Sequence, residues 1–65
     1  MDIEIISTLI QKYVEDGQLG YARQTAELLK RTLTTEELET ILRKCVENEW
    51  LDDTLNIVSL LRQRK

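Results

Sequence analysis

Apolar residues recur at three- and four-residue spacing in four separate stretches of this chain, which predicts four amphipathic helices. The expected helices cover residues 3–15, 18–32, 35–47 and 50–64. No proline interrupts them, and no stretch has the residue alternation of a strand. We therefore expect an all-α fold of four short helices, arranged as two stacked αα-hairpins.

The residues expected to point into the core share one face of each helix. In the first two helices they are Ile3, Ile6, Leu9, Ile10, Tyr13 and Val14, followed by Leu19, Ala22, Ala26 and Leu29. In the last two they are Leu38, Ile41, Leu42, Cys45 and Val46, followed by Leu51, Leu55, Val58 and Leu61.

The second half of the chain aligns with the first without a gap when it is shifted by 32 residues, and eight of the 33 aligned pairs are identical. The turns align as well, because Asp16-Gly17 falls opposite Asn48-Glu49. A period of this size is typical of repeat architectures. The sequence predicts one domain, residues 1–65, built from two helical-hairpin repeats at 1–32 and 33–65.

Both repeats begin with the same kind of helix start. Met1-Asp2 with Ile6, and Leu33-Thr34 with Leu38, each read as an apolar residue, a cap and an apolar residue at the fourth helical position, which is a hydrophobic staple. Thr34 and Glu37 add a full capping box in the second repeat. Gly17 is expected to end the first helix in the left-handed conformation.

The composition limits how such a small domain can be stabilised. The chain has 65 residues, of which 42% are hydrophobic, and it has no Phe, no His and a single cysteine. One cysteine excludes an internal disulfide, and without His or a cysteine pair we expect no metal and no other cofactor. Self-association is the remaining way to bury more apolar surface.

The polar composition bears on partners and location. The net charge of −3 argues against a phosphate-binding surface over the whole molecule. No window is long and apolar enough to span a membrane, and no signal peptide is apparent, so we expect no membrane contact. A lone thiol favours a reducing compartment, and we expect a cytoplasmic protein.

The side chains that might support catalysis have simpler structural interpretations. Cys45 falls on a predicted core face, and the chain has no His to serve as its base. The pairs Glu36-Glu37 and Asp52-Asp53 each fall in the first turn of a helix, where negative charge offsets the helix dipole. We expect neither an enzyme nor a small-molecule substrate.

The last helix has apolar residues over a wider arc than the ~100° stripe of an ordinary surface helix. The predicted contact surface lies on the second and fourth helices and consists of Trp50, Ile57 and Leu60, with Tyr21 and Leu28 at its margin. An aromatic and aliphatic side chains beyond the core stripe are typical of an interface. The leading interpretation is a small protein–protein interaction module, either a homodimer or bound to another protein.

The basic residues offer an alternative interpretation. They close the second and fourth predicted helices and are Lys30, Arg31, Arg62, Arg64 and Lys65. The repeat places the two clusters at equivalent sites, so they could form one basic edge that contacts an acidic partner or a phosphate. An RNA- or DNA-binding helical-repeat protein is therefore the alternative function.

The pattern resembles the helical-hairpin repeat superfamily, which includes the tetratricopeptide and pentatricopeptide repeats. It is most similar to a degenerate pentatricopeptide repeat, on the run Leu9-Ile10, Tyr13, Gly17, Leu19, Ala22 and Leu28-Leu29, with Ile41-Leu42, Cys45, Leu51 and Thr54 in the second copy. The resemblance implies stacked hairpins. In that family a polar residue early in the first helix of each repeat reads RNA, a place filled here by Ser7 and Glu39.

Overall fold

The computed structural model describes residues 2–64, and within this range it consists of four α-helices and no strand. The helices are α1 (Ile3–Glu15), α2 (Leu19–Leu28), α3 (Thr35–Glu47) and α4 (Leu51–Gln63). The prediction of an all-α fold with four short helices is confirmed.

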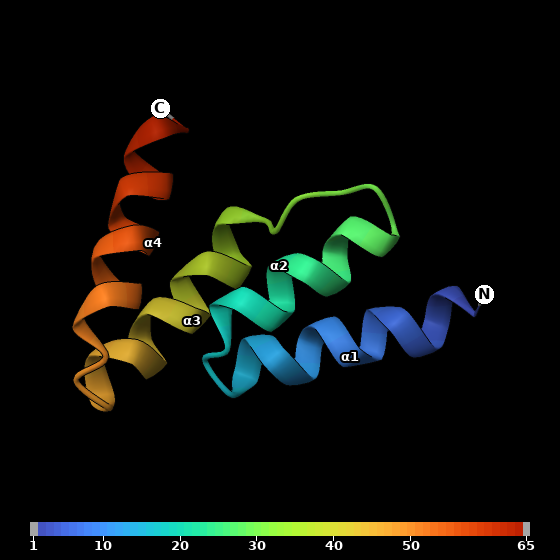
Figure 1. Ribbon diagram of the computed structural model, residues 1–65, viewed down its shortest axis with the longest axis horizontal. Coiled ribbons are helices and arrows are strands. Elements are labelled where there is room, and N and C mark those ends of the chain that lie inside the picture. Colours follow the sequence, from blue (N-terminus) through green and yellow to red (C-terminus); the bar gives the residue numbers. More distant parts are fainter. Residues whose placement is uncertain (1, 65) are drawn as a thin grey trace.

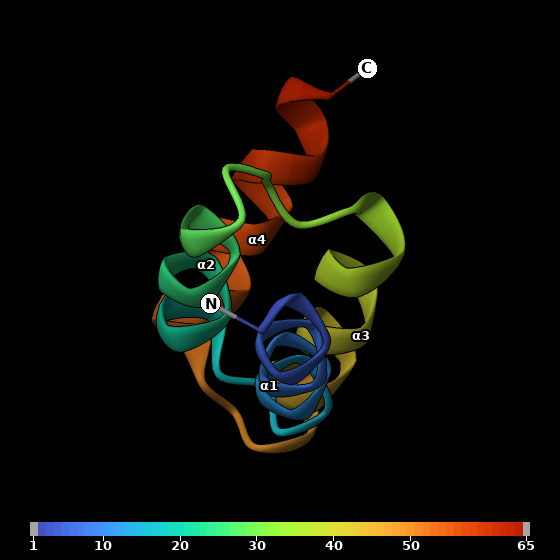
Figure 2. The ribbon, with the colours of Figure 1, turned by 90° about the vertical axis from the view of Figure 1, so that its right-hand side faces the viewer.

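The helices form two hairpins that pack side by side. α1 packs against α2, α3 packs against α4, and α1 also lies along α3. α4 is steeply inclined to the other three helices, and its C-terminal half rises above them (Figure 1). Viewed end-on, α1 lies below and between α2 and α3, with α4 behind (Figure 2). The molecule measures 34 × 26 × 16 Å, and α2 and α3 lie side by side across its shortest dimension (Figure 2).

The starts of α1 and α3 are capped as the sequence predicts. The Asp2 carboxylate accepts the amide of Glu4 at 2.9 Å, which satisfies a free N–H of the first turn of α1. At α3 the Thr34 hydroxyl accepts the Glu37 amide at 3.1 Å, and the Glu37 carboxylate accepts the Thr34 amide at 2.8 Å. This capping box is confirmed.

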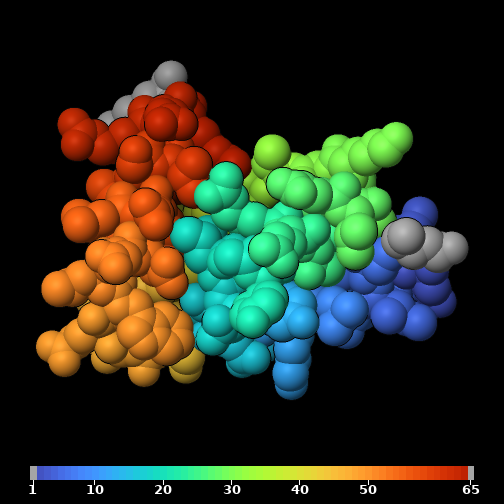
Figure 3. Space-filling model, viewed as in Figure 1, coloured from blue at the N-terminus to red at the C-terminus, as the bar shows by residue number. Residues whose placement is uncertain are grey.

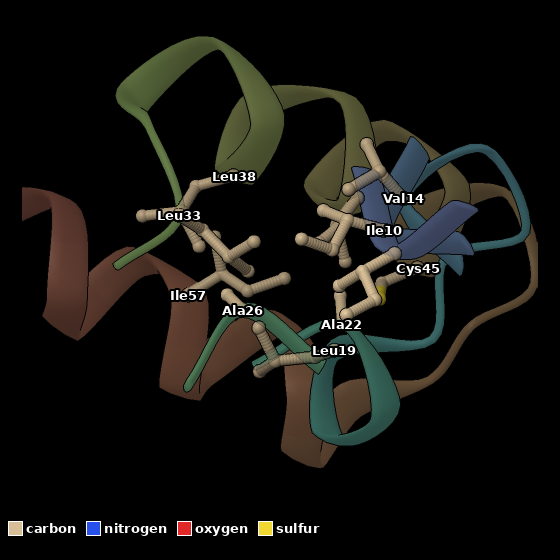
Figure 4. Packing of buried hydrophobic residues seen from close by; sticks show 11 residues of the cluster. Ile10, Val14, Leu19, Ala22, Ala26, Leu33, Leu38, Cys45 and Ile57 are labelled. Carbon is tan, nitrogen blue, oxygen red and sulfur yellow. The ribbon is translucent and has the colours of Figure 1, made fainter. Parts of the chain in front are cut away.

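The apolar partners of the caps can be compared with the predicted staples. Leu33 and Leu38 are both buried and lie close together in the core, as a staple requires (Figure 4). The corresponding staple before α1 involves Met1, which lies outside the described residues.

Three helices end in the same backbone motif, with one residue in the left-handed region. These residues are Gly17 (φ 73°), Lys30 (φ 54°) and Glu49 (φ 58°). After each helix two amides bond back to carbonyls of the last turn, as in Gly17 to Val14 at 3.1 Å and Gln18 to Tyr13 at 2.9 Å. This is the Schellman arrangement, which satisfies carbonyls that the helix leaves free.

The second helix is shorter than predicted. It ends at Leu28 instead of continuing to residue 32. The Lys30 amide bonds to Glu27 O at 2.9 Å and the Arg31 amide to Ala26 O at 3.2 Å, so the chain turns away at this point. The turn frees residues 31–34 to fold back over the core, where Leu33 is only 3% exposed. Lys30 and Arg31 therefore follow α2 instead of forming its last turn.

One aliphatic cluster forms the core between the two hairpins (Figure 4). The predicted core faces of α1, α2 and α3 are confirmed at most positions. The buried apolar residues are Ile6, Ile10, Val14, Leu19, Ala22, Ala26, Leu33, Leu38, Ile41, Cys45 and Ile57. Three predicted core residues, Ile3, Leu9 and Val46, are exposed, because each lies on a flank of its helix that no other helix covers.

The helix boundaries follow the 32-residue spacing, since α3 starts 32 residues after α1 and α4 starts 32 residues after α2. Burial follows it less closely. Leu19 is 4% exposed, whereas Leu51, its counterpart, is 70% exposed. The internal repeat therefore stays a prediction.

Substitution of the two glycines by alanine should change the stability of the fold in opposite directions. A methyl group on Gly17 would meet the Lys44 side chain at 2.6 Å while the backbone keeps φ at +73°. Gly17→Ala should destabilise the fold by at least about 1–2 kcal/mol. Gly20 lies in α2 with nothing within 4 Å of its added methyl group, so Gly20→Ala should stabilise it by about 0.5–1 kcal/mol. Urea unfolding of both variants measures the difference, and effects of the same sign would contradict the turn geometry.

The capping box predicts a second difference in stability. Thr34→Ala removes a side-chain acceptor at the start of α3 and should cost about 0.5–2 kcal/mol. Thr8→Ala is the matched control, because the exposed Thr8 hydroxyl only donates to the Glu4 carbonyl inside α1. Urea midpoints of the two variants should differ accordingly, and equal midpoints would place the start of α3 elsewhere.

Candidate protein interface

A stripe of exposed aliphatic side chains runs along α4. Leu51, Leu55 and Val58 are 70%, 68% and 38% exposed, respectively. Their spacing of four and three residues places them on one side of the helix. Leu55 and Val58 also line a shallow groove together with Arg62. We call Leu51, Leu55 and Val58 the α4 stripe.

The apolar arc of α4 is divided between core and surface differently from the prediction, although Leu61 packs against the core as expected. Ile57 was expected at the interface, but it is fully buried and points into the cluster near Ala26 (Figure 4). Leu60 is partly buried and packs against the same cluster. The residues predicted to face inward, Leu51, Leu55 and Val58, form the exposed stripe. The predicted contact surface is therefore wrong at Ile57 and largely wrong at Leu60.

The remaining predicted contact residues lie at the surface. Trp50 occupies the N-cap position of α4 without a side-chain capping bond and is 37% exposed. Its ring approaches Gly17, since a methyl group added there would lie 3.1 Å from Trp50 Cζ3. Tyr21 is 59% exposed and stacks on Tyr13 of α1, with ring centroids 5.4 Å apart. Leu28 is exposed at the end of α2. Tyr21 thus belongs to the α1/α2 side and Trp50 to the junction of the hairpins.

Two of the predicted basic residues, one from each cluster, lie at the same cavity. Arg31 is paired with Glu37, and together with Arg64 it lines a cavity between the two hairpins. Arg62 instead lines the groove beside the α4 stripe. Lys30 is exposed at the left-handed position after α2, and Lys65 lies outside the described residues.

Glu37 joins three parts of the chain through one carboxylate. Arg31 donates two hydrogen bonds to it, Nη1 to Oε1 and Nη2 to Oε2, both at 3.1 Å. Gln11 of α1 donates to Oε2 at 2.6 Å, and the Thr34 amide donates to Oε1. The capping box was visible in the sequence, but the contacts with Gln11 and Arg31 were not, because they depend on how the linker folds back.

These contacts change the acidity of Glu37. Hydrogen bonding to the Arg31 guanidinium is the largest cause that lowers its pKa, to about 2, and the bonds from Thr34 and Gln11 act in the same direction. Burial opposes the shift because it penalises the charged carboxylate. Glu37 is 8% exposed and remains ionised in the fold well below its ordinary range.

Cys45 is a core residue, as the sequence predicts. It is fully buried, and its thiol lies 3.8 Å from the Gly17 carbonyl, to which it donates a weak hydrogen bond. Burial raises the pKa of the thiol, and the nearby charge of Asp53 adds to the shift. A reactive cysteine needs the opposite shift.

The longest helices within residues 2–64 have 13 residues each. None of the four helices has the length and apolar character needed to cross a membrane. No group of three or more acidic or cysteine side chains in this range is placed to hold a metal ion.

Comparisons with family models, curated proteins and solved structures found no match to this chain.

The Glu37 contacts predict a pH-dependent contribution to stability. The pKa falls from 4.5 to about 2 on folding, so the stabilisation is complete above about pH 4.5 and is lost as the pH falls toward 2. Glu37→Gln should therefore cost about 2–3 kcal/mol at pH 7 and much less at pH 2. Urea unfolding at pH 7, 4.5, 3 and 2 measures this difference.

The neighbouring carboxylate provides the control. Glu36 lies in the same first turn of α3 but is exposed. Glu36→Gln should change stability by no more than about 0.5 kcal/mol at any of these pH values. If the stability lost in Glu37→Gln is the same at every pH, the charge of the carboxylate does not stabilise the fold. The shape of the Glu37 side chain would then be its contribution.

Proposed function

We propose that this chain is a small, non-catalytic protein–protein interaction module that acts in the cytoplasm and pairs with a second copy of itself through α4. The α4 stripe is the observation that carries the proposal. A small domain with no disulfide or metal gains stability by covering such a surface. The buried thiol of Cys45 is consistent with a reducing compartment.

The counterparts of the stripe in the first hairpin support a helical occupant. Leu51 and Val58 lie 32 residues after Leu19 and Ala26, which are buried. The first hairpin has a second hairpin beside it, whereas the corresponding side of α4 is open (Figure 1). Other helices packed along α4 would bury Leu51 and Val58 as Leu19 and Ala26 are buried.

A two-fold arrangement fits both the shape and the charge of the stripe. An isologous contact needs only one self-complementary patch, and a two-fold axis across α4 makes the paired helices antiparallel. If the axis crosses near Ile57, Leu55 of one copy meets Val58 of the other. Asp52 at the start of α4 then approaches Arg62 near the end of its partner, so opposite charges meet.

The resemblance to helical-hairpin repeats supports the same architectural proposal. In repeat proteins each unit is stabilised by its neighbours, and about three stacked units are usually needed. Two hairpins from each of two chains would supply four. We therefore propose a helical-repeat fold of the pentatricopeptide type in which a second copy packs against the exposed side of α4.

The proposal predicts the mass of the protein in solution. Sedimentation equilibrium at tens of micromolar should give a dimer for the wild type and a monomer for Leu55→Glu/Val58→Glu. Both substituted side chains are exposed, so the variant should keep its helical circular dichroism. A wild-type monomer with a cooperative melt would exclude self-association and leave the stripe for a different protein.

A second variant distinguishes the two-fold dimer from head-to-tail stacking. Ile5 and Leu9 line a shallow apolar groove on α1, at the other end of the molecule, and Ile5 is 60% exposed. Ile5→Glu should leave the two-fold dimer intact. Loss of association in Ile5→Glu, or a wild-type mass that keeps rising with concentration, would contradict the two-fold arrangement.

A further inference from the structure

A cavity of about 130 Å³ lies between the two hairpins, away from the α4 stripe. It is bounded by α2, the linker that follows it, the start of α3 and the end of α4. The space-filling view shows a notch at the upper edge of the molecule between the last turns of α4 and the segment that follows α2 (Figure 3). The cavity is lined by parts of the chain that only the fold brings together.

The lining combines an apolar floor with arginines from three elements. Ala26, Leu33, Leu38 and Leu60 supply the aliphatic part. Arg23 of α2, Arg31 of the linker and Arg64 after α4 supply the guanidinium groups, and Glu27 is the one carboxylate in the lining. The chain has five arginines and a net charge of −3. Three of these arginines line one cavity, so positive charge is concentrated there although the protein is negatively charged as a whole.

The three arginines are held differently. Arg31 is fixed by Glu37 and by its own bond to the Thr32 carbonyl at 2.8 Å, so its charge is largely balanced within the fold. Arg31–Glu37 is the one ion pair within residues 2–64, so Arg23 and Arg64 have no carboxylate partner in this range. An anion in the cavity would supply the balancing charge that these two side chains lack.

The size and lining of the cavity define the class of ligand. Its volume is close to the ~150 Å³ of an engineered protein cavity that holds benzene, which corresponds to about six non-hydrogen atoms. Guanidinium groups match planar oxyanions with paired hydrogen bonds. The aliphatic floor favours a hydrocarbon group attached to that oxyanion. We propose that this cavity binds a small aliphatic carboxylate.

Titration with matched probes tests the proposal. The probes are butanoate, the uncharged butan-1-ol and inorganic phosphate, each followed by amide chemical shifts in ¹H–¹⁵N spectra. The carboxylate should give saturable shifts at Thr32, Leu33 and Leu60, which lie in the cavity wall. An alcohol that binds equally well would exclude a role for the arginines. Phosphate that binds equally well would exclude a role for the apolar floor. Either result, or no saturable shift, would overturn the assignment.

Arginine variants locate the site. Arg23→Gln and Arg64→Gln should each weaken carboxylate binding by about three- to tenfold, since each removes one charge-assisted contact. Arg43→Gln is the matched control, because Arg43 is exposed on α3 and does not line the cavity. Thermal melts establish that all three variants are folded. Equal affinity in the two cavity variants and the control would contradict the proposal.

Discussion

The Glu37 carboxylate sets the path of the chain between the two hairpins. Its partners come from α1, from the linker and from the cap of α3, so one buried charge fixes three elements relative to each other. Burying a carboxylate is unfavourable unless nearly every oxygen lone pair is used, and here the two oxygens accept four hydrogen bonds from side chains and backbone. Because Arg31 is drawn toward Glu37, α2 must end early and Leu33 is brought down over the core. The same constraint places Arg31 in the wall of the cavity.

The small number of helices determines the rest of the surface. Each of the four helices packs closely against only one or two others, so each keeps an uncovered side. The large apolar residues Ile3, Ile5, Leu51 and Leu55 are each at least 60% exposed, and the core is closed by small side chains such as Ala22 and Ala26. The aliphatic content of the chain therefore exceeds what four short helices can bury. The proposed dimer covers the part of that excess that lies on α4.

The sequence was sufficient where local physical rules decide the structure. α1 and α3 have the predicted boundaries, because caps and apolar spacing act within a few residues. The core faces of α2 and α3 followed from periodicity for the same reason. The end of α2 was missed because no glycine marks it, and Lys30 adopts a positive φ that its residue type rarely takes.

α4 shows where periodicity is insufficient. The apolar side chains of α4 cover too wide an arc for all of them to face the core. The sequence therefore shows that some of them face solvent, but it does not show which ones. Helical periodicity predicted Leu51 and Val58 in the core, and their counterparts at the 32-residue spacing, Leu19 and Ala26, are buried. Those counterparts are buried by the neighbouring hairpin, and α4 has no such neighbour on that side. Burial at such a position depends on what packs beside the helix, which the spacing of apolar residues does not specify.

The two proposed sites use different sides of the same helix. The stripe lies on the open side of α4, whereas Leu60 and Arg64 face the cavity from its last turns. Beyond Ile57 the partly buried Leu60 and Leu61 pack these turns against the core cluster. A carboxylate bound by Arg64 and Arg23 would fix the end of α4 to α2. Arg62, which is proposed to approach Asp52 of the second copy, lies in this same segment. Carboxylate binding in the cavity and formation of the dimer would therefore both depend on an ordered C-terminal end of α4.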